Sequence, residues 1–161
     1  MKYLLMMAVC LLTHFSFAQT AVVTTVYLLR HAEKADTSAN PDLSEAGIQR
    51  ARKLVSMFET IPIDLFFSTP YKRTQQTISA VADSKQKEIT TYKPADMDLR
   101  KLIAQNPGKT ILIVGHSNTI PKYINTLLDK KTYQDIPESE FDHLYTIRVL
   151  GAQVSCELTK I

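Results

Sequence analysis

The sequence predicts an α/β fold: a three-layer α/β/α sandwich with a mostly parallel sheet and an antiparallel hairpin at its C-terminal edge. Apolar runs of strand length alternate with segments of helical periodicity, which is typical of a parallel sheet covered by helices on both faces. Two β-rich runs flank Gly151 near the end of the chain, which indicates an antiparallel hairpin. The length of 161 residues suits one domain with a proper core.

The first 18 residues have the pattern of a secretory signal peptide. Lys2 precedes an apolar run at residues 4–12. Ser16 and Ala18 are small residues of the kind that a signal-peptide cleavage site requires. We therefore expect residues 1–18 to be a signal peptide and residues 19–161 to be the functional domain. The protein is expected to be exported, either to the periplasm or outside the cell. No membrane attachment is expected after cleavage, because no later stretch approaches roughly 18 apolar residues.

Charge and cysteine content exclude some classes of function. The chain has 19 Lys and Arg against 16 Asp and Glu, a net charge of +3, which gives no reason to expect a nucleic-acid partner. Only Cys156 lies outside the predicted signal peptide, so no disulfide is expected within the domain. We expect this cysteine to be a small packed side chain.

The first half of the domain should alternate strand and helix. Residues 22–29 and 64–67 are apolar runs of strand length, and Ser44 between them can cap a helix. A second helix should begin near Lys72 and be followed by a short strand at residues 88–92. The apolar face of the first helix is predicted to comprise Ile48, Ala51, Leu54, Val55 and Phe58, and that of the second Ile78, Val81 and Ala82.

The second half continues this alternation and then changes character. A short helix is predicted at residues 96–104, with Leu99, Leu102 and Ile103 facing inward, and a turn at residues 106–108 ends it. A strand at 110–114 follows, and then a helix that begins after Asn118 with Pro121 in its first turn. The polar residues 130–139 are expected to form a surface loop. Residues 144–150 and 152–158 should form the edge hairpin.

Three of the predicted strands are each followed at once by a polar motif. These motifs contain Arg30-His31, Arg73 within residues 68–77, and His116. In an open α/β sheet, ligands bind outside the carboxyl ends of the strands, so motifs distant in sequence can meet there. Together they predict one pocket for an anion, with a nucleophile in it.

The residue types suit phosphoryl transfer. Arg30 discourages protonation of the adjacent His31, which keeps a ring nitrogen available to attack phosphorus. Arg30 and Arg73 can hold the phosphoryl oxygens through their planar guanidinium groups, and the helix that opens near Arg73 favours an anion as well. His116, as an imidazolium, could stabilise a transferring oxygen.

Smaller polar residues complete the predicted site. Thr69 and Thr74 can donate from their hydroxyl groups, and Ser117 and Asn118 suit a tight turn that presents donors to the ligand. A metal site could also be drawn from His31, His116 and Glu33, but no further spacing supports it, and two arginines would repel a cation. We therefore expect no metal ion and no other cofactor.

These residues resemble the histidine phosphatase superfamily, also called phosphoglycerate mutase-like. The similarity runs through residues 30–33, 43–47, 68–77 and 114–118, in the family's order, and Ala32 departs from the usual Gly of its Arg-His-Gly motif. The resemblance implies a phosphohistidine intermediate on His31 and a phosphate pocket of Arg30, Arg73 and His116, without a metal. The short length is similar to that of phosphohistidine phosphatases.

The general acid is not assigned by these motifs. Members of the mutase type supply a Glu after the third strand, where this chain offers Asp96, taken here as the first candidate, and Asp98. Either could equally cap a helix. Glu33 and Asp142 are the further candidates, and a raised pKa would be expected of whichever acts.

Three functions remain open. The first choice is a phosphatase that hydrolyses phosphomonoesters or phosphoramidates of a small molecule or a phosphoprotein. The alternatives are a phosphomutase and a phosphate-binding module without catalysis. Residues 77–110 are too few for much of a lid, which favours hydrolysis because a mutase must keep water from its intermediate.

Overall fold

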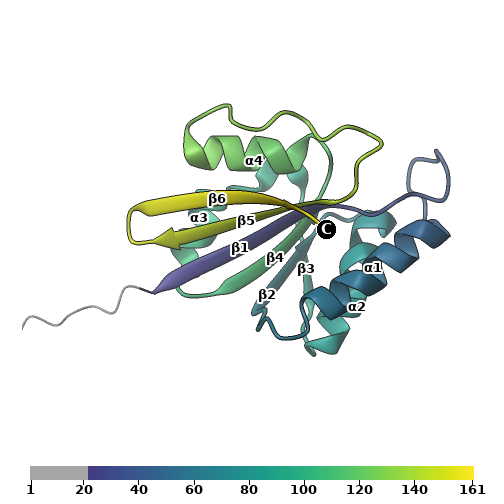
Figure 1. The fold of residues 1–161 in the computed structure, drawn as a ribbon, viewed down its shortest axis with the longest axis horizontal. Coiled ribbons are helices and arrows are strands. Elements are labelled where there is room, and N and C mark those ends of the chain that lie inside the picture. The colour runs from purple at the N-terminus through teal and green to yellow at the C-terminus, as the bar shows by residue number, and fades with distance from the viewer. Residues whose placement is uncertain (1–21) are drawn as a thin grey trace, which may run out of the picture.

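The computed structural model describes residues 22–161, so the predicted signal peptide lies outside the described residues. One six-stranded sheet forms the centre, with the strand order β3-β2-β4-β1-β5-β6 (Figure 1). The first four strands in that order are parallel, and the last two form an antiparallel hairpin at the sheet edge. The strands are β1 (Val23–Arg30), β2 (Leu65–Ser68), β3 (Ile89–Thr91), β4 (Thr110–Gly115), β5 (His143–Leu150) and β6 (Gln153–Lys160). The predicted fold class is confirmed.

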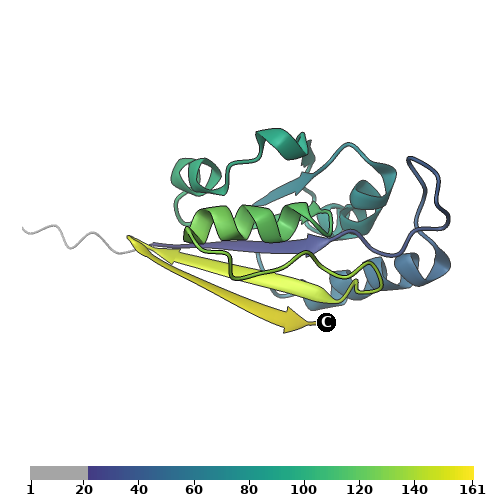
Figure 2. The same cartoon turned by 90° about the horizontal axis from the view of Figure 1, so that it is seen from above.

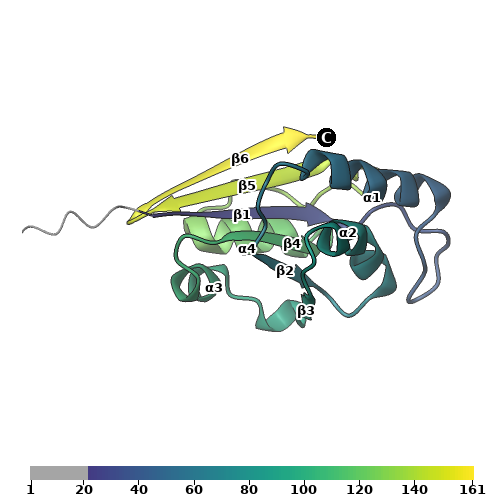
Figure 3. The same cartoon turned by 90° about the horizontal axis from the view of Figure 1, so that it is seen from below.

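Two helices cover each face of the sheet (Figures 1 and 3). Helices α1 (Glu45–Met57) and α2 (Lys72–Ser84) pack together on one face, and α3 (Leu99–Gln105) and α4 (Thr119–Leu128) lie on the other. Neighbouring residues of β1 pack on opposite faces of the sheet: Leu28 packs with α3 and α4, and Leu29 packs with α1 and α2. This alternation follows from the two-residue period of a strand and explains why buried strands read as continuous apolar runs.

The free edge is formed by β6, which extends beside β5 at the side of the sheet away from β3 (Figure 2). Cys156 of β6 packs partly against the core under α4, as expected for a small apolar side chain. In the described part of the chain, no helix combines the length and the apolar character that crossing a membrane requires.

Three local predictions need correction. Ile48 is 37% exposed, because Gly47 takes its place on the buried face of α1. The helix predicted at residues 96–104 is divided into a 3-10 turn, η1 (Pro94–Asp96), and α3, because Asp98 caps α3 by accepting from the Lys101 N–H. Residues 130–139 are more than a surface loop, since Ile136 is buried in the core.

Gly47 permits close packing between α1 and the segment that follows β1. A Cβ at this position would lie 2.3 Å from the backbone oxygen of Glu33, which no side chain can do without moving the backbone. Ser44 caps α1 and its N–H also donates to that same oxygen. The start of α1 is therefore fixed against the segment that carries His31.

Candidate active site

The strand register brings the two site histidines together. β1 and β4 are parallel neighbours with Arg30 opposite Gly115, so His31 and His116 both follow paired residues at the carboxyl ends of these strands. The His31 N–H donates to the Gly115 oxygen, and the two imidazole centroids are 5.5 Å apart. The two motifs therefore meet at one sheet edge, as the sequence predicts.

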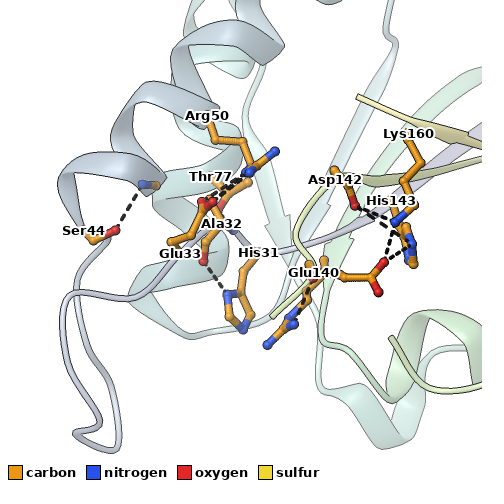
Figure 4. A network of polar contacts seen from close by, with 12 residues as sticks. His31, Ala32, Glu33, Ser44, Arg50, Thr77, Glu140, Asp142, His143 and Lys160 are labelled. Carbon is orange, nitrogen blue, oxygen red and sulfur yellow. Dashed lines mark hydrogen bonds and ion pairs between the residues drawn. The ribbon is translucent and has the colours of Figure 1, made fainter. Parts of the chain in front are cut away.

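A hydrogen bond to its neighbouring carbonyl fixes the tautomer of His31. Nδ1 lies 2.7 Å from the oxygen of Ala32, and a carbonyl oxygen can only accept. Figure 4 draws this contact as a dashed line between the two residues. Nδ1 therefore carries the proton, and Nε2 of the neutral ring carries the lone pair that can attack phosphorus. Ala32 is buried, and its N–H donates to the Thr77 hydroxyl.

Burial lowers the pKa of His31 to about 4, with the charge of Arg30 acting in the same direction and the hydrogen bond to Ala32 opposing them. Burial likewise lowers the pKa of His116 to about 4, followed by the charges of Arg73 and Arg30. Both rings are neutral in the free protein at ordinary pH. This suits His31 as a nucleophile, whereas His116 becomes the imidazolium predicted from the sequence only if a bound anion offsets the two arginines.

Arg30 is held in place by the segment before β5. Its Nη1 donates to the backbone oxygens of Pro137 and Glu140, and its guanidinium lies 4.2 Å from the centre of the Phe141 ring. Nη2 donates to the Glu138 carboxylate at 2.6 Å. The side chain is 1% exposed, and its Nε has no hydrogen-bond partner among residues 22–161.

Arg73 approaches the site from the first turn of α2. Its guanidinium stacks on Tyr71 at 4.4 Å from the ring centre, and the Tyr71 ring is 5.3 Å from that of His116. Its Nη1 makes a long hydrogen bond to the Ala39 oxygen, while its buried Nε is without a partner in the described chain. Two buried guanidinium Nε donors that lack an acceptor in the described chain, beside two imidazoles, are what an anion site requires.

The threonines predicted for the site hold His116. The hydroxyl of Thr69 is 3.1 Å from His116 Nε2 and 2.8 Å from the hydroxyl of Thr74. Thr74 in turn contacts the backbone oxygens of Thr69 and Tyr71. This chain of hydroxyl groups connects the end of β2, the start of α2 and the imidazole, so it orients His116.

None of the four candidate acids contacts the site. Asp96 is exposed at the end of η1, and its carboxylate makes no hydrogen bond or ion pair within residues 22–161, while Asp98 caps α3. Asp142 faces Lys160 and His143 at the end of the sheet (Figure 4). Glu33 is bound by Arg50 at 2.7 Å, and although burial raises its pKa, these hydrogen bonds lower it below the usual range. Asp96, the first candidate, therefore has no observed link to His31.

The segment at residues 136–141 was not identified from the sequence as part of the site. Ser117, a predicted substrate-binding residue, donates its hydroxyl to Glu138, and Phe141 lies 6.2 Å from the His31 ring. Asn118 is exposed at the start of α4 without a side-chain capping bond. No spacing in the sequence distinguished Glu138 from the polar residues around it.

The lowered histidine pKa values predict an unusual pH dependence. The neutral form of each ring predominates above about pH 4, so the value of kcat/KM, which reports the free enzyme, should stay nearly constant from pH 7 down to pH 5.5. A histidine with the ordinary pKa of about 6.5 would lose about tenfold at pH 5.5. The pH profile should be measured with two aryl phosphates whose phosphate groups have different pKa values. A change caused by ionisation of the substrate then shifts between the two profiles, whereas one caused by the protein does not. An acid limb near pH 6.5 with both substrates would contradict the site as described.

Comparisons with known proteins agree with this fold and these motifs. Residues 26–94 match the family model of the histidine phosphatase superfamily (branch 1). The comparison with curated proteins gave no match.

Several solved structures share the fold. A SixA phosphohistidine phosphatase candidate from Agrobacterium tumefaciens is 19% identical with a TM-score of 0.65, and the match covers 85% of this chain and 98% of that one. The protein histidine phosphatase SixA in complex with tungstate is 14% identical with a TM-score of 0.67, over 84% and 96% of the two chains. Phosphoserine phosphatase from Entamoeba histolytica, with 3-phosphoglyceric acid, is 18% identical with a TM-score of 0.57, over 82% and 97%.

At these identities the likeness to solved structures is one of fold. The sequence match adds the first strand, α1, β2 and α2, which carry His31 and Arg73. The resemblance drawn from the sequence is thereby confirmed: residues 26–94 match the histidine phosphatase superfamily (branch 1), and the fold is similar to that of the solved structures over more than four fifths of the chain.

Proposed function

We propose that the protein is a phosphatase that hydrolyses phosphomonoesters or phosphoramidates through a phosphohistidine on His31. One observation carries this proposal: the His31 Nε2 lone pair is fixed beside two guanidinium groups whose buried Nε donors have no partner in the described chain. The family match supports phosphatase chemistry in general.

The first step is attack by His31 Nε2 on phosphorus. An N–P bond forms, and the bond from phosphorus to the leaving oxygen or nitrogen breaks with its electron pair. Arg30 and Arg73 hold the non-bridging oxygens, and His116 stabilises the developing charge once the bound anion favours its protonated form. The reaction needs no metal ion, because the charge on the phosphoryl group is met by these side chains.

In the second step water attacks the phosphohistidine. The P–N bond breaks, phosphate is released and Nε2 recovers its lone pair, while the proton of the attacking water passes to solvent or to phosphate. Since no carboxyl group of residues 22–161 contacts the two histidines, leaving groups that need little help from an acid should react fastest. Phosphoramidates and aryl phosphates are of that kind, and a phosphorylated protein or small molecule could supply them.

The proposal also covers where the enzyme acts and what it acts on. The signal peptide predicted at residues 1–18 puts the enzyme in the periplasm or outside the cell, where its substrates must be exported or released phosphorylated compounds. The structural neighbours include a protein histidine phosphatase and a phosphoserine phosphatase, which supports both substrate classes.

A phosphate-release assay tests the function. Purified residues 19–161 should release phosphate from an aryl phosphate in the presence of EDTA, and tungstate or vanadate should inhibit the reaction. Binding of phosphate without turnover would favour a binding module instead. Isomerised product without released phosphate would favour a mutase. Either outcome overturns the proposed phosphatase.

A further inference from the structure

Glu138 places a carboxylate between two residues that lie next to the site histidines. Its Oε2 is 2.6 Å from Nη2 of Arg30, and its Oε1 accepts from the Ser117 hydroxyl at 2.8 Å. These partners directly adjoin His31 and His116 in sequence. The carboxylate therefore connects the two segments that carry the site histidines.

The exposures of the two partners show which one covers the other. The Arg30 side chain is 1% exposed, while that of Glu138 is 74% exposed. The carboxylate accordingly lies on the side of the guanidinium nearer to solvent. An exposed glutamate gains little by itself from such an ion pair, so the pairing is of interest for what it does to Arg30.

Glu138 is not needed to orient Arg30. Two backbone oxygens, those of Pro137 and Glu140, already take both Nη1 hydrogens, and Phe141 stacks on the guanidinium plane. These contacts fix the plane and the direction of the group. What Glu138 adds is a negative charge and an acceptor on Nη2, which is a donor that a phosphoryl oxygen could otherwise use.

The charge also matters for the whole site. With both histidines neutral, Arg30 and Arg73 carry two positive charges, and the Glu138 carboxylate removes one of them. The hydrogen bond from Ser117 and the charge of Arg30 keep the pKa of Glu138 below its usual range, so the carboxylate is ionised wherever the enzyme would work. A doubly charged oxyanion must then bind beside a fixed negative charge.

We propose that Glu138 is a built-in competitor of the oxyanion, a residue that keeps the affinity for doubly charged phosphate low. This inference rests on the proposed function and extends it, because released phosphate is the product of hydrolysis. Glu138 would limit inhibition by that product and would disfavour binding of doubly charged phosphoryl groups relative to singly charged ones.

The variant Glu138→Gln isolates the charge. Its amide oxygen can still accept from Arg30, while the negative charge is gone. Glu157→Gln is the matched control, since it makes the same change of charge on the edge strand β6, where Glu157 faces Arg148 at 3.6 Å. Thermal melting of all three proteins shows that each is folded.

Inorganic phosphate at pH 8 is the probe, measured by calorimetry and as a competitive inhibitor of aryl phosphate hydrolysis. We expect Glu138→Gln to bind phosphate at least about 10-fold more tightly than the wild type, because removing a unit charge about 5 Å from a dianion is worth about 15-fold in affinity even at the dielectric constant of water. The KM for an aryl phosphate dianion should fall in parallel. Glu157→Gln should change neither value by more than about twofold.

Phosphate affinity that is unchanged or weaker in Glu138→Gln would overturn the inference, because it would make Glu138 an orienting residue for Arg30. That result leaves the proposed phosphatase intact, since turnover and phosphohistidine formation are measured separately. If neither protein binds phosphate while both release it from an aryl phosphate, the inference is overturned and the proposed phosphatase stands. The phosphatase fails only if the wild type releases no phosphate.

Discussion

Replacing His31 by alanine should abolish turnover of an aryl phosphate. The imidazole is the only described nucleophile whose lone pair is directed by a fixed tautomer into the group of two arginines and His116. Loss of a nucleophile from a covalent mechanism can cost on the order of 10⁶-fold in kcat. We expect a loss of at least about 10⁴-fold for His31→Ala, measured as phosphate released per enzyme.

Two controls make this result specific. His143→Asn alters another buried histidine, which pairs with Glu140 outside the site, and should keep turnover within about tenfold of the wild type. His31→Ala should still bind inorganic phosphate, because Arg30, Arg73 and His116 remain. Wild-type turnover by His31→Ala would show that phosphorus is attacked by another group.

Replacing Arg73 by alanine should cost about 10² to 10³-fold in kcat/KM, the usual effect of removing one donor to a developing charge. Arg73 contributes little to the fold: it stacks on Tyr71 and makes one long hydrogen bond to Ala39. The loss should therefore appear in phosphate affinity and in turnover, with little change in the melting temperature. Arg73→Lys should recover only part of the activity, because an ammonium cannot reproduce the planar, two-pronged contact.

Lys72→Ala provides the comparison for Arg73. Lys72 is the adjacent cation at the start of α2, but it is exposed and pairs with Asp42 at 3.1 Å. Its removal changes the net charge equally and should alter kcat/KM by less than about threefold. Equal effects of Lys72→Ala and Arg73→Ala would indicate general electrostatic attraction in place of a defined contact.

The fold could be predicted largely from the sequence because local patterns and tertiary structure agree. Strand-length apolar runs coincide with β1, β2 and β4, and Ser44 caps α1 as predicted. The failures arise where contacts between distant segments decide. Ile48 has the spacing of a core residue, yet the close approach of Gly47 to Glu33 rotates it outward.

The site could be predicted only in part, for the same reason. His31 and His116 follow paired strand ends, so topology alone brings them together. The role of residues 136–141 depends on how a loop packs over Arg30, and loop conformation leaves no periodic pattern in the sequence. Asp96 was the first candidate for the general acid because it follows the third strand, but the 3-10 turn η1 leaves it exposed, without a hydrogen bond or ion pair to the site histidines.

The most direct test of the account is to trap the intermediate. Wild-type enzyme mixed with a ³²P-labelled substrate and quenched in denaturant should carry a phosphoryl group that is stable in base and lost in acid, and peptide mapping should place it on His31. The adduct should be absent from His31→Ala. Hydrolysis that proceeds without any such adduct, or with the label on another residue, would contradict the proposed chemistry of this site.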